Sequence, residues 1–160
     1  MRKFPVVYMR GGTSKGIMFL EKDLPGREEW DDIFVQCMGS PDPKQIDGVG
    51  GCVSSNNKIV VVRPSERPGV DVDYIVGQSI VGQSKIDYKS NCGNMTAAVG
   101  PFAVESGLVD IKEPITNVHL FNRNTDKYID VTVPIDHETG TFAQDGDCHI
   151  AGVDGTAAEL

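Results

Sequence analysis

Residues 90–99, with the sequence SNCGNMTAAV, decide the fold that we expect for this chain. Apolar residues continue from this stretch to about Ser106 and fall on nearly every side of a helical wheel, which predicts an enclosed helix. Asn94 belongs to the residue types preferred at the N-cap, and Gly93 allows a sharp turn just before it. The pattern therefore predicts a buried central helix that begins near Asn94 and ends before Gly107.

Cys92 precedes this helix and would lie at the mouth of an apolar interior. Backbone N–H groups and the positive end of the helix dipole favour anions at that point, including the thiolate form of a cysteine. One interpretation is a carboxylate-bearing substrate beside a thiolate base. The other is that Cys92 is a small buried hydrophobic residue, as most free cysteines are.

The segments around the central helix have the patterns of one further helix and of several strands. An amphipathic helix is predicted over residues 28–38, and Gly39 and Pro41 end it. The expected fold class is α+β, with a strongly curved mixed sheet of eight or nine short strands, barrel-like, wrapped around the central helix and the amphipathic helix outside. We expect residues 1–150 to form one domain and residues 151–160 to begin a linker to a second, absent domain. The predicted strands are residues 4–9, 17–20, 59–62, 70–76, 80–81, 85–88, 118–121 and 128–133, with a further segment at 141–143.

Composition excludes several classes of function. The chain has 15 Lys and Arg against 23 Asp and Glu, a formal net charge of −8, which argues against binding to nucleic acid or to anionic membranes. No apolar run approaches the roughly 20 residues of a membrane helix, and the first residues lack the apolar core of a signal peptide, so a cytoplasmic location is expected. The 4 cysteines have no C-x-x-C spacing and predict no zinc site.

Two further segments offer groups for binding anions. The sequence RGGTSKG (residues 10–16) lacks the order of a Walker motif. It predicts either a carboxylate-binding loop, with donors from the backbone and from Thr13 and Ser14, or a tight hairpin turn. The polar residues 52–57 lead to Lys58 at the start of a strand, where the lysine is either a cation for a carboxylate or a solvated edge residue.

Five motifs together resemble the PrpF family of isomerases. That family includes 2-methylaconitate cis-trans isomerase, 4-oxalomesaconate tautomerase and methylitaconate isomerase, and it shares the diaminopimelate epimerase-like fold. Its members have two similar halves that face each other across the active site, and this chain resembles the N-terminal half. The motifs are MRGGTSKG (9–16), GSPD (39–42), QIDG (45–48), NCGN (91–94) and GPFA (100–103).

The resemblance implies which residues form the site. Cys92 and Lys58 correspond to the catalytic pair, and Asp154 stands where the family commonly has proline. The implied reaction is a cofactor-independent isomerisation of an unsaturated di- or tricarboxylate, such as 2-methylaconitate or aconitate, through an enolate-like intermediate, with no metal. The expected partners are the missing C-terminal half-domain or a second copy of this chain. The expected substrate-binding residues are Gly12, Thr13, Ser14, Ser55, Asn91, Gly93 and Asn94.

Two other functions stay open at this point. The first is a non-catalytic half-domain that binds polycarboxylates without converting them. The second is a cysteine hydrolase, with Cys92 as nucleophile and His119 or His149 as base.

Overall fold

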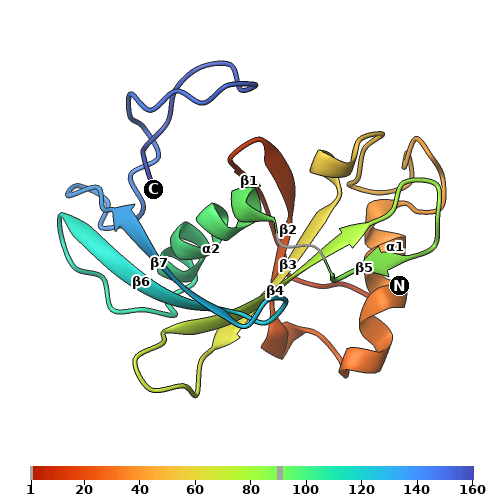
Figure 1. Ribbon diagram of the computed structural model, residues 1–160, viewed down its shortest axis with the longest axis horizontal. Coiled ribbons are helices and arrows are strands. Elements are labelled where there is room, and N and C mark those ends of the chain that lie inside the picture. Colours follow the sequence, from red (N-terminus) through yellow and green to blue (C-terminus); the bar gives the residue numbers. More distant parts are fainter. Residues whose placement is uncertain (1, 90–91) are drawn as a thin grey trace.

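The computed structural model describes residues 2–89 and 92–160 (Figure 1). One mixed seven-stranded sheet has the order β1-β2-β3-β4-β6-β7, and β5 pairs with the end of β4. The pairs β2–β3 and β4–β6 are parallel, and the others are antiparallel. The strands are β1 (Val7–Gly11), β2 (Ser14–Leu20), β3 (Lys58–Pro64), β4 (Val72–Ser79), β5 (Ile86–Asp87), β6 (Ile115–Asn122) and β7 (Lys127–Pro134).

The sheet curls around helix α2 (Gly93–Glu105), and helix α1 (Trp30–Met38) covers its outer face (Figure 1). Strand β3 shows how the sequence builds both layers. Val60 and Val62 point into the hydrophobic cluster that contains α2, whereas Ile59 and Val61 point into the cluster that contains α1. A strand that is buried on both faces has a continuous run of apolar residues, as β3 has at residues 59–62. The curved sheet, the enclosed helix and the outer helix are confirmed.

Helix α2 is capped two residues earlier than the sequence predicts. Its N-cap is Cys92, which makes no capping hydrogen bond with its side chain, so the prediction of Asn94 as N-cap is wrong. Asn94 instead lies in the first turn of the helix, and its side chain is directed to the β1–β2 hairpin, where the amide nitrogen donates to Thr13 Oγ1 at 2.8 Å. At the other end, Gly107 has a φ of 67° directly after the C-cap, a conformation that favours glycine.

Two of the predicted strand segments are not strands. Ile80 and Val81 lie in the turn before β5, where the Ile80 N–H donates to Lys85 O at 3.0 Å. At residues 141–143 the structure has only an isolated bridge between Ile135 and Phe142. Short apolar runs are compatible with several structures, and here turn hydrogen bonds decide the local conformation.

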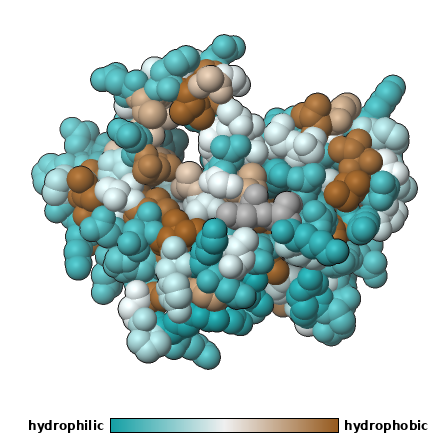
Figure 2. Space-filling view, viewed as in Figure 1, coloured by the Kyte–Doolittle hydropathy of each residue, from teal (hydrophilic) through white to brown (hydrophobic). Residues whose placement is uncertain are grey.

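Residues 143–160 contain no named helix or strand and lie at the top of Figure 1, above β1 and α2. A bridge between Cys148 and Ala157 closes this segment into a loop. On the face shown in Figure 2, hydrophilic residues predominate and hydrophobic residues gather in several small groups, one of them over this loop. None of the helices in the described part of the chain is long and apolar enough to cross a membrane.

Gly16 is required for the pairing of β2 with β3. A Cβ atom at this position would collide with the backbone carbonyl of its partner Lys58. We therefore expect Gly16→Ala to lower the free energy of unfolding by about 1–3 kcal/mol, the range for overpacking. Gly93→Ala is the matched control, because a Cβ there meets nothing within 4 Å, and it should leave stability unchanged or slightly higher. Urea unfolding of both variants measures the difference, and equal stability would contradict this packing argument.

Candidate active site

The candidate site lies where the starts of β2, β3 and α2 meet the end of β4. Lys58 pairs with Gly16 on one side and with Gln78 on the other. Because side chains alternate along a strand, Lys58 shares the α2 face of β3 with Val60, and Ser14 shares the α2 face of β2 with Met18. The register therefore directs Ser14, Lys58 and Gln78 toward the face that carries the start of α2.

Cys92 contacts the β1–β2 hairpin directly. Its Sγ lies 3.8 Å from Ser14 Oγ, and Ser14 is buried. The Asn94 amide nitrogen donates to Thr13 Oγ1 at 2.8 Å and to Ser14 Oγ at 3.4 Å. The hydroxyls of the hairpin, the thiol and the first turn of α2 thus form one polar group that the structure brings together.

Glycines in the hairpin allow this approach. A Cβ at Gly11 would collide with Asn94 O, and a Cβ at Gly12 would collide with the Asn94 side chain. Gly12 also has a φ of 52°, and Gly11 pairs with Ser14, so the loop is a tight hairpin turn. The second interpretation of this segment is therefore correct for its backbone, while its hydroxyls still face the start of α2.

Lys58 is only 8% exposed, so the alternative of a solvated edge lysine is wrong. Its Nζ donates to Gln78 Oε1, a neutral acceptor. Among the described residues it has no carboxylate partner in an ion pair. A cation removed from water is costly unless it is paired, so an anionic ligand beside Lys58 would gain a partner that the protein itself does not supply.

The other predicted site residues are less closely joined. Gly93 is exposed at the first position of α2. Ser55 is half-buried in the short 3-10 helix η3 (Ser54–Asn56), just before β3. Asn91 lies outside the described residues. His119 is exposed on the face of β6 opposite Val118 and Leu120 and pairs with Asp130, and His149 bonds to Gly155 O, so neither joins the Cys92 group.

The four thiols have different surroundings. Cys52 is exposed, whereas Cys37, Cys92 and Cys148 are half-buried. Burial raises the pKa of the Cys37 thiol, which makes it less reactive at neutral pH. Of the four, Cys92 alone is placed at the start of a helix. Residues 2–89 and 92–160 contain no cluster of three His, Cys, Asp or Glu side chains that could hold a metal ion.

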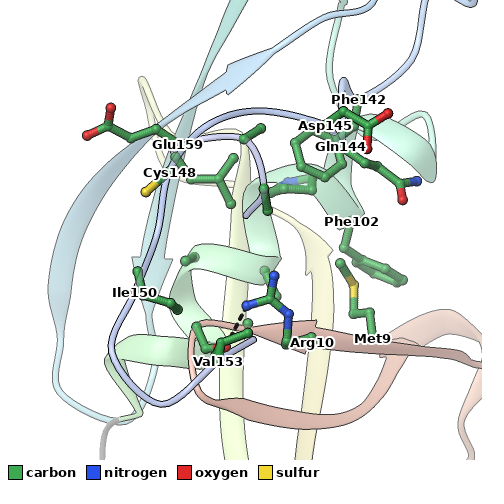
Figure 3. A pocket seen from close by; sticks show the side chains of 18 of the residues that line it. Met9, Arg10, Phe102, Phe142, Gln144, Asp145, Cys148, Ile150, Val153 and Glu159 are labelled. Carbon is green, nitrogen blue, oxygen red and sulfur yellow. Dashed lines mark hydrogen bonds between the residues drawn. The ribbon is translucent and has the colours of Figure 1, made fainter. Parts of the chain in front are cut away.

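A cavity of about 1020 Å³ lies at a different place. Figure 3 shows it between Met9 and Arg10 of β1, Phe102 of α2 and the loop formed by the C-terminal segment. Cys148 lines it, but Cys92 and Lys58 do not. Its outer wall is formed by residues 142–160.

Comparison with known proteins decides the family. The model of the PrpF family, described as PrpF protein, matches residues 1–160. The chain belongs to the PrpF family. The resemblance seen in the five motifs is thereby confirmed.

Named relatives of this PrpF chain are isomerases and tautomerases. It is 44% identical to 4-oxalomesaconate tautomerase of Pseudomonas putida, over 99% of this chain and 44% of that protein. It is 42% identical to 2-methyl-aconitate isomerase of Cupriavidus necator, over 99% of this chain and 42% of that protein. The PrpF chain spans less than half the length of these relatives.

Solved structures agree with the family and the fold. The crystal structure of methylitaconate-delta-isomerase matches with a TM-score of 0.92 and 42% identity, over 97% of the PrpF chain and 40% of that protein. A hydroxyproline epimerase from Agrobacterium vitis matches with a TM-score of 0.55 and 12% identity, over 87% of this chain and 39% of that protein, and shows a shared fold alone. The expected epimerase-like fold is confirmed.

Sequence reasoning missed three polar residues that contact the site of this PrpF chain. Gln78 receives the hydrogen bond from Lys58, and Tyr74 and Thr96 form a buried hydrogen bond of 2.8 Å beneath Cys92. Tyr74 fits the pattern of an alternating strand and Thr96 fits the pattern of a helix, so the sequence indicates only a packing role for both. A polar group at a fully buried position was the one available signal, because such groups need hydrogen-bond partners.

Proposed function

We propose that this chain supplies the acid–base half of an isomerase that moves a double bond, or rotates a bond, in an unsaturated di- or tricarboxylate. The observation that carries the proposal is the juxtaposition of two groups. A thiol at the start of a helix contacts the start of β2, and a buried lysine, which has no carboxylate partner among the described residues, lies at the start of the neighbouring strand β3. The names of the relatives, which refer to oxalomesaconate and methylaconitate, support the substrate class.

The proposed chemistry needs one base and one anion-stabilising group. The Cys92 thiolate takes a proton from a carbon that is alpha to a carboxylate or vinylogously conjugated with it. The electron pair delocalises into an enolate-like anion, which the Lys58 ammonium and the N–H groups at the start of α2 stabilise. The double bond shifts or the bond rotates, and the proton returns to carbon. Every step uses groups of the protein, and no cofactor takes part in this scheme.

Ser14, Thr13 and Asn94 are proposed to bind the substrate carboxylates. Their hydroxyl and amide groups already bond to one another across the hairpin and α2. A carboxylate would replace part of this network with charge-assisted hydrogen bonds, which are shorter and stronger than neutral ones. Ser55, Asn91 and Gly93 complete the proposed set from the neighbouring segments, and Gly12 allows the close approach of the hairpin.

Turnover is proposed to require more than this chain. Cys92 is half-buried and Gly93 is exposed, so solvent reaches the start of α2, where the remainder of a longer protein, or a second copy of this chain, would exclude water. Two unit charges 4 Å apart interact by about 4 kcal/mol at an effective dielectric of 20 but by about 1 kcal/mol in bulk water. A loss of about 3 kcal/mol of transition-state stabilisation corresponds to roughly a hundredfold in rate.

The test is proton exchange in D2O, followed by NMR with 2-methylaconitate, cis-aconitate and 4-oxalomesaconate. The full polypeptide that carries this sequence should incorporate deuterium into at least one of them. The 160-residue chain alone should be at least about a hundredfold slower, for the reason given above. Binding without exchange in the full polypeptide would favour the alternative of a non-catalytic carboxylate-binding domain.

A further inference from the structure

A buried row of polar groups connects the backbone of Cys92 to strands β4 and β6. Thr96 Oγ1 donates to Cys92 O at 3.2 Å, and the Thr96 N–H donates to the same oxygen at 3.1 Å. Tyr74 Oη lies 2.8 Å from Thr96 Oγ1, and Asn122 Nδ2 donates to Tyr74 Oη at 2.8 Å. The carbonyl of the proposed catalytic residue is therefore the end point of hydrogen bonds that begin two strands away.

The hydrogen bonds in this row all point the same way. The amide nitrogen of Asn122 can only donate, so the Tyr74 oxygen accepts from it. The carbonyl of Cys92 can only accept, so the Thr96 hydroxyl uses its hydrogen there. The hydroxyl hydrogen of Tyr74 is then directed to Thr96. Hydrogen bonds aligned in this way polarise one another, so the last one is strengthened by those before it.

The row is buried and remains neutral. Tyr74 and Asn122 are fully buried, and Thr96 is 8% exposed. Burial raises the pKa of Tyr74, the hydrogen bonds with Thr96 and Asn122 partly offset this effect, and the charge of Cys92 raises the pKa further. Tyr74 therefore stays protonated at neutral pH and keeps its role as donor.

The far end of the row is fixed by the turn between β6 and β7. Asn122 Oδ1 accepts the N–H groups of Asn124 at 2.8 Å and Thr125 at 3.2 Å. The Asn124 side chain in turn bonds to both backbone groups of Val76 and to Tyr88 O, all at 2.7–2.8 Å. One turn thus holds the row that ends at Cys92 and also the backbone carbonyl of Tyr88.

Packing alone does not account for this row. The cluster around Tyr74 is otherwise hydrophobic, and an aromatic ring without a hydroxyl would fill the same space. A buried hydroxyl with its hydrogen bonds made adds little to the free energy of unfolding. If the hydroxyl loses its partners, its burial costs free energy. Neither Tyr74 nor Thr96 takes part in the chemistry proposed above, and their hydrogen bonds end on the backbone of Cys92 and not on its sulfur.

We propose that Tyr74 is a positioning residue, which acts through Thr96 to hold the backbone of Cys92 at the start of α2. The role of Cys92 as the base rests on the proposed function, but the positioning itself does not. With the carbonyl held by two donors, the thiol stays against Ser14 and beside the N–H groups of the first helical turn, which favour the thiolate. Loss of the Tyr74 hydroxyl lets this turn shift and makes the thiol less reactive.

The test compares the rates at which iodoacetamide alkylates Cys92 at pH 7 in the full polypeptide, with mass mapping of the modified peptide. Tyr74→Phe and Thr96→Val should each slow alkylation by about three- to tenfold, the effect of losing one hydrogen bond. The double variant should be no slower than the slower single variant, because the two residues belong to one row. Thr96→Ser keeps the hydroxyl, so Cys92 in this variant should be alkylated within about twofold of the rate in the unmodified protein.

Tyr128→Phe is the matched control, because Tyr128 is 68% exposed on β7. In this variant Cys92 should be alkylated at the same rate as in the unmodified protein. The proposal is overturned if Tyr74→Phe and Thr96→Val lower the melting temperature while Cys92 alkylates at an unchanged or higher rate, or if Thr96→Ser fails to restore the rate. Alkylation needs no substrate. Lack of proton exchange in the unmodified protein would therefore contradict the proposed function, whereas the alkylation rates would still test the positioning role of Tyr74.

Discussion

Replacing Cys92 with serine in the full polypeptide is expected to slow proton exchange on unsaturated carboxylates by about 10²- to 10⁴-fold, the usual contribution of a general base. Serine keeps the size of the side chain and a hydrogen bond to Ser14, but its hydroxyl is not ionised at neutral pH. The change therefore removes the base and little else. Rates of deuterium incorporation by NMR provide the measurement.

The control for this variant is Cys52→Ser, because Cys52 is exposed and has no part in the proposed site. It should exchange protons at the unmodified rate, and both variants should unfold at similar urea concentrations. Retention of more than about one tenth of the rate in Cys92→Ser would assign the base to another group, since such a small loss is below the range for a lost base.

Replacing Lys58 with methionine is expected to lower kcat by about 10²- to 10³-fold, the effect of removing one group that stabilises a developing anion. Methionine has a similar length and no charge. Because Lys58 is buried and bonds to neutral Gln78, its replacement should leave the free energy of unfolding unchanged or raise it. Loss of activity together with retained stability is the expected combination.

Lys85→Met is the matched control, because Lys85 lies exposed in the turn before β5. It removes the same charge from the molecule and should leave kcat unchanged. If Lys58→Met kept kcat within a few-fold, or if it unfolded the protein, Lys58 would be a structural residue and the two-group scheme would fail.

Much of the fold could be predicted from local patterns. The nearly all-apolar run after Cys92 predicts an enclosed helix, and the continuous apolar run of residues 59–62 predicts a strand, which the structure buries on both faces as β3. Helix α1 ends at Met38 with Gly39 as its C-cap, as Gly39 and the following Pro41 predict. In each case the signal depends on neighbours in sequence, and packing follows from it.

The rest of the site depends on the register between distant segments, which the sequence does not display. Gln78 meets Lys58 because β3 and β4 pair with one register out of many. Asn94 is a good N-cap residue in isolation, but in the structure it lies in the first turn of α2 and its side chain contacts the hairpin at Thr13. The motif NCGN identified the thiol, but not the buried row through Tyr74 that supports it.

The most direct test of the account is protection of Cys92 from alkylation by cis-aconitate, measured by mass mapping of all four cysteines in the full polypeptide. If the substrate carboxylates bind at Ser14, Asn94 and Lys58, cis-aconitate at ten times its Kd should slow alkylation of Cys92 by about tenfold through mass action. Cys52, which is exposed, should react at the same rate with and without the ligand. An unchanged rate at Cys92 under saturating ligand, or protection of Cys148 in the large cavity instead, would contradict the account.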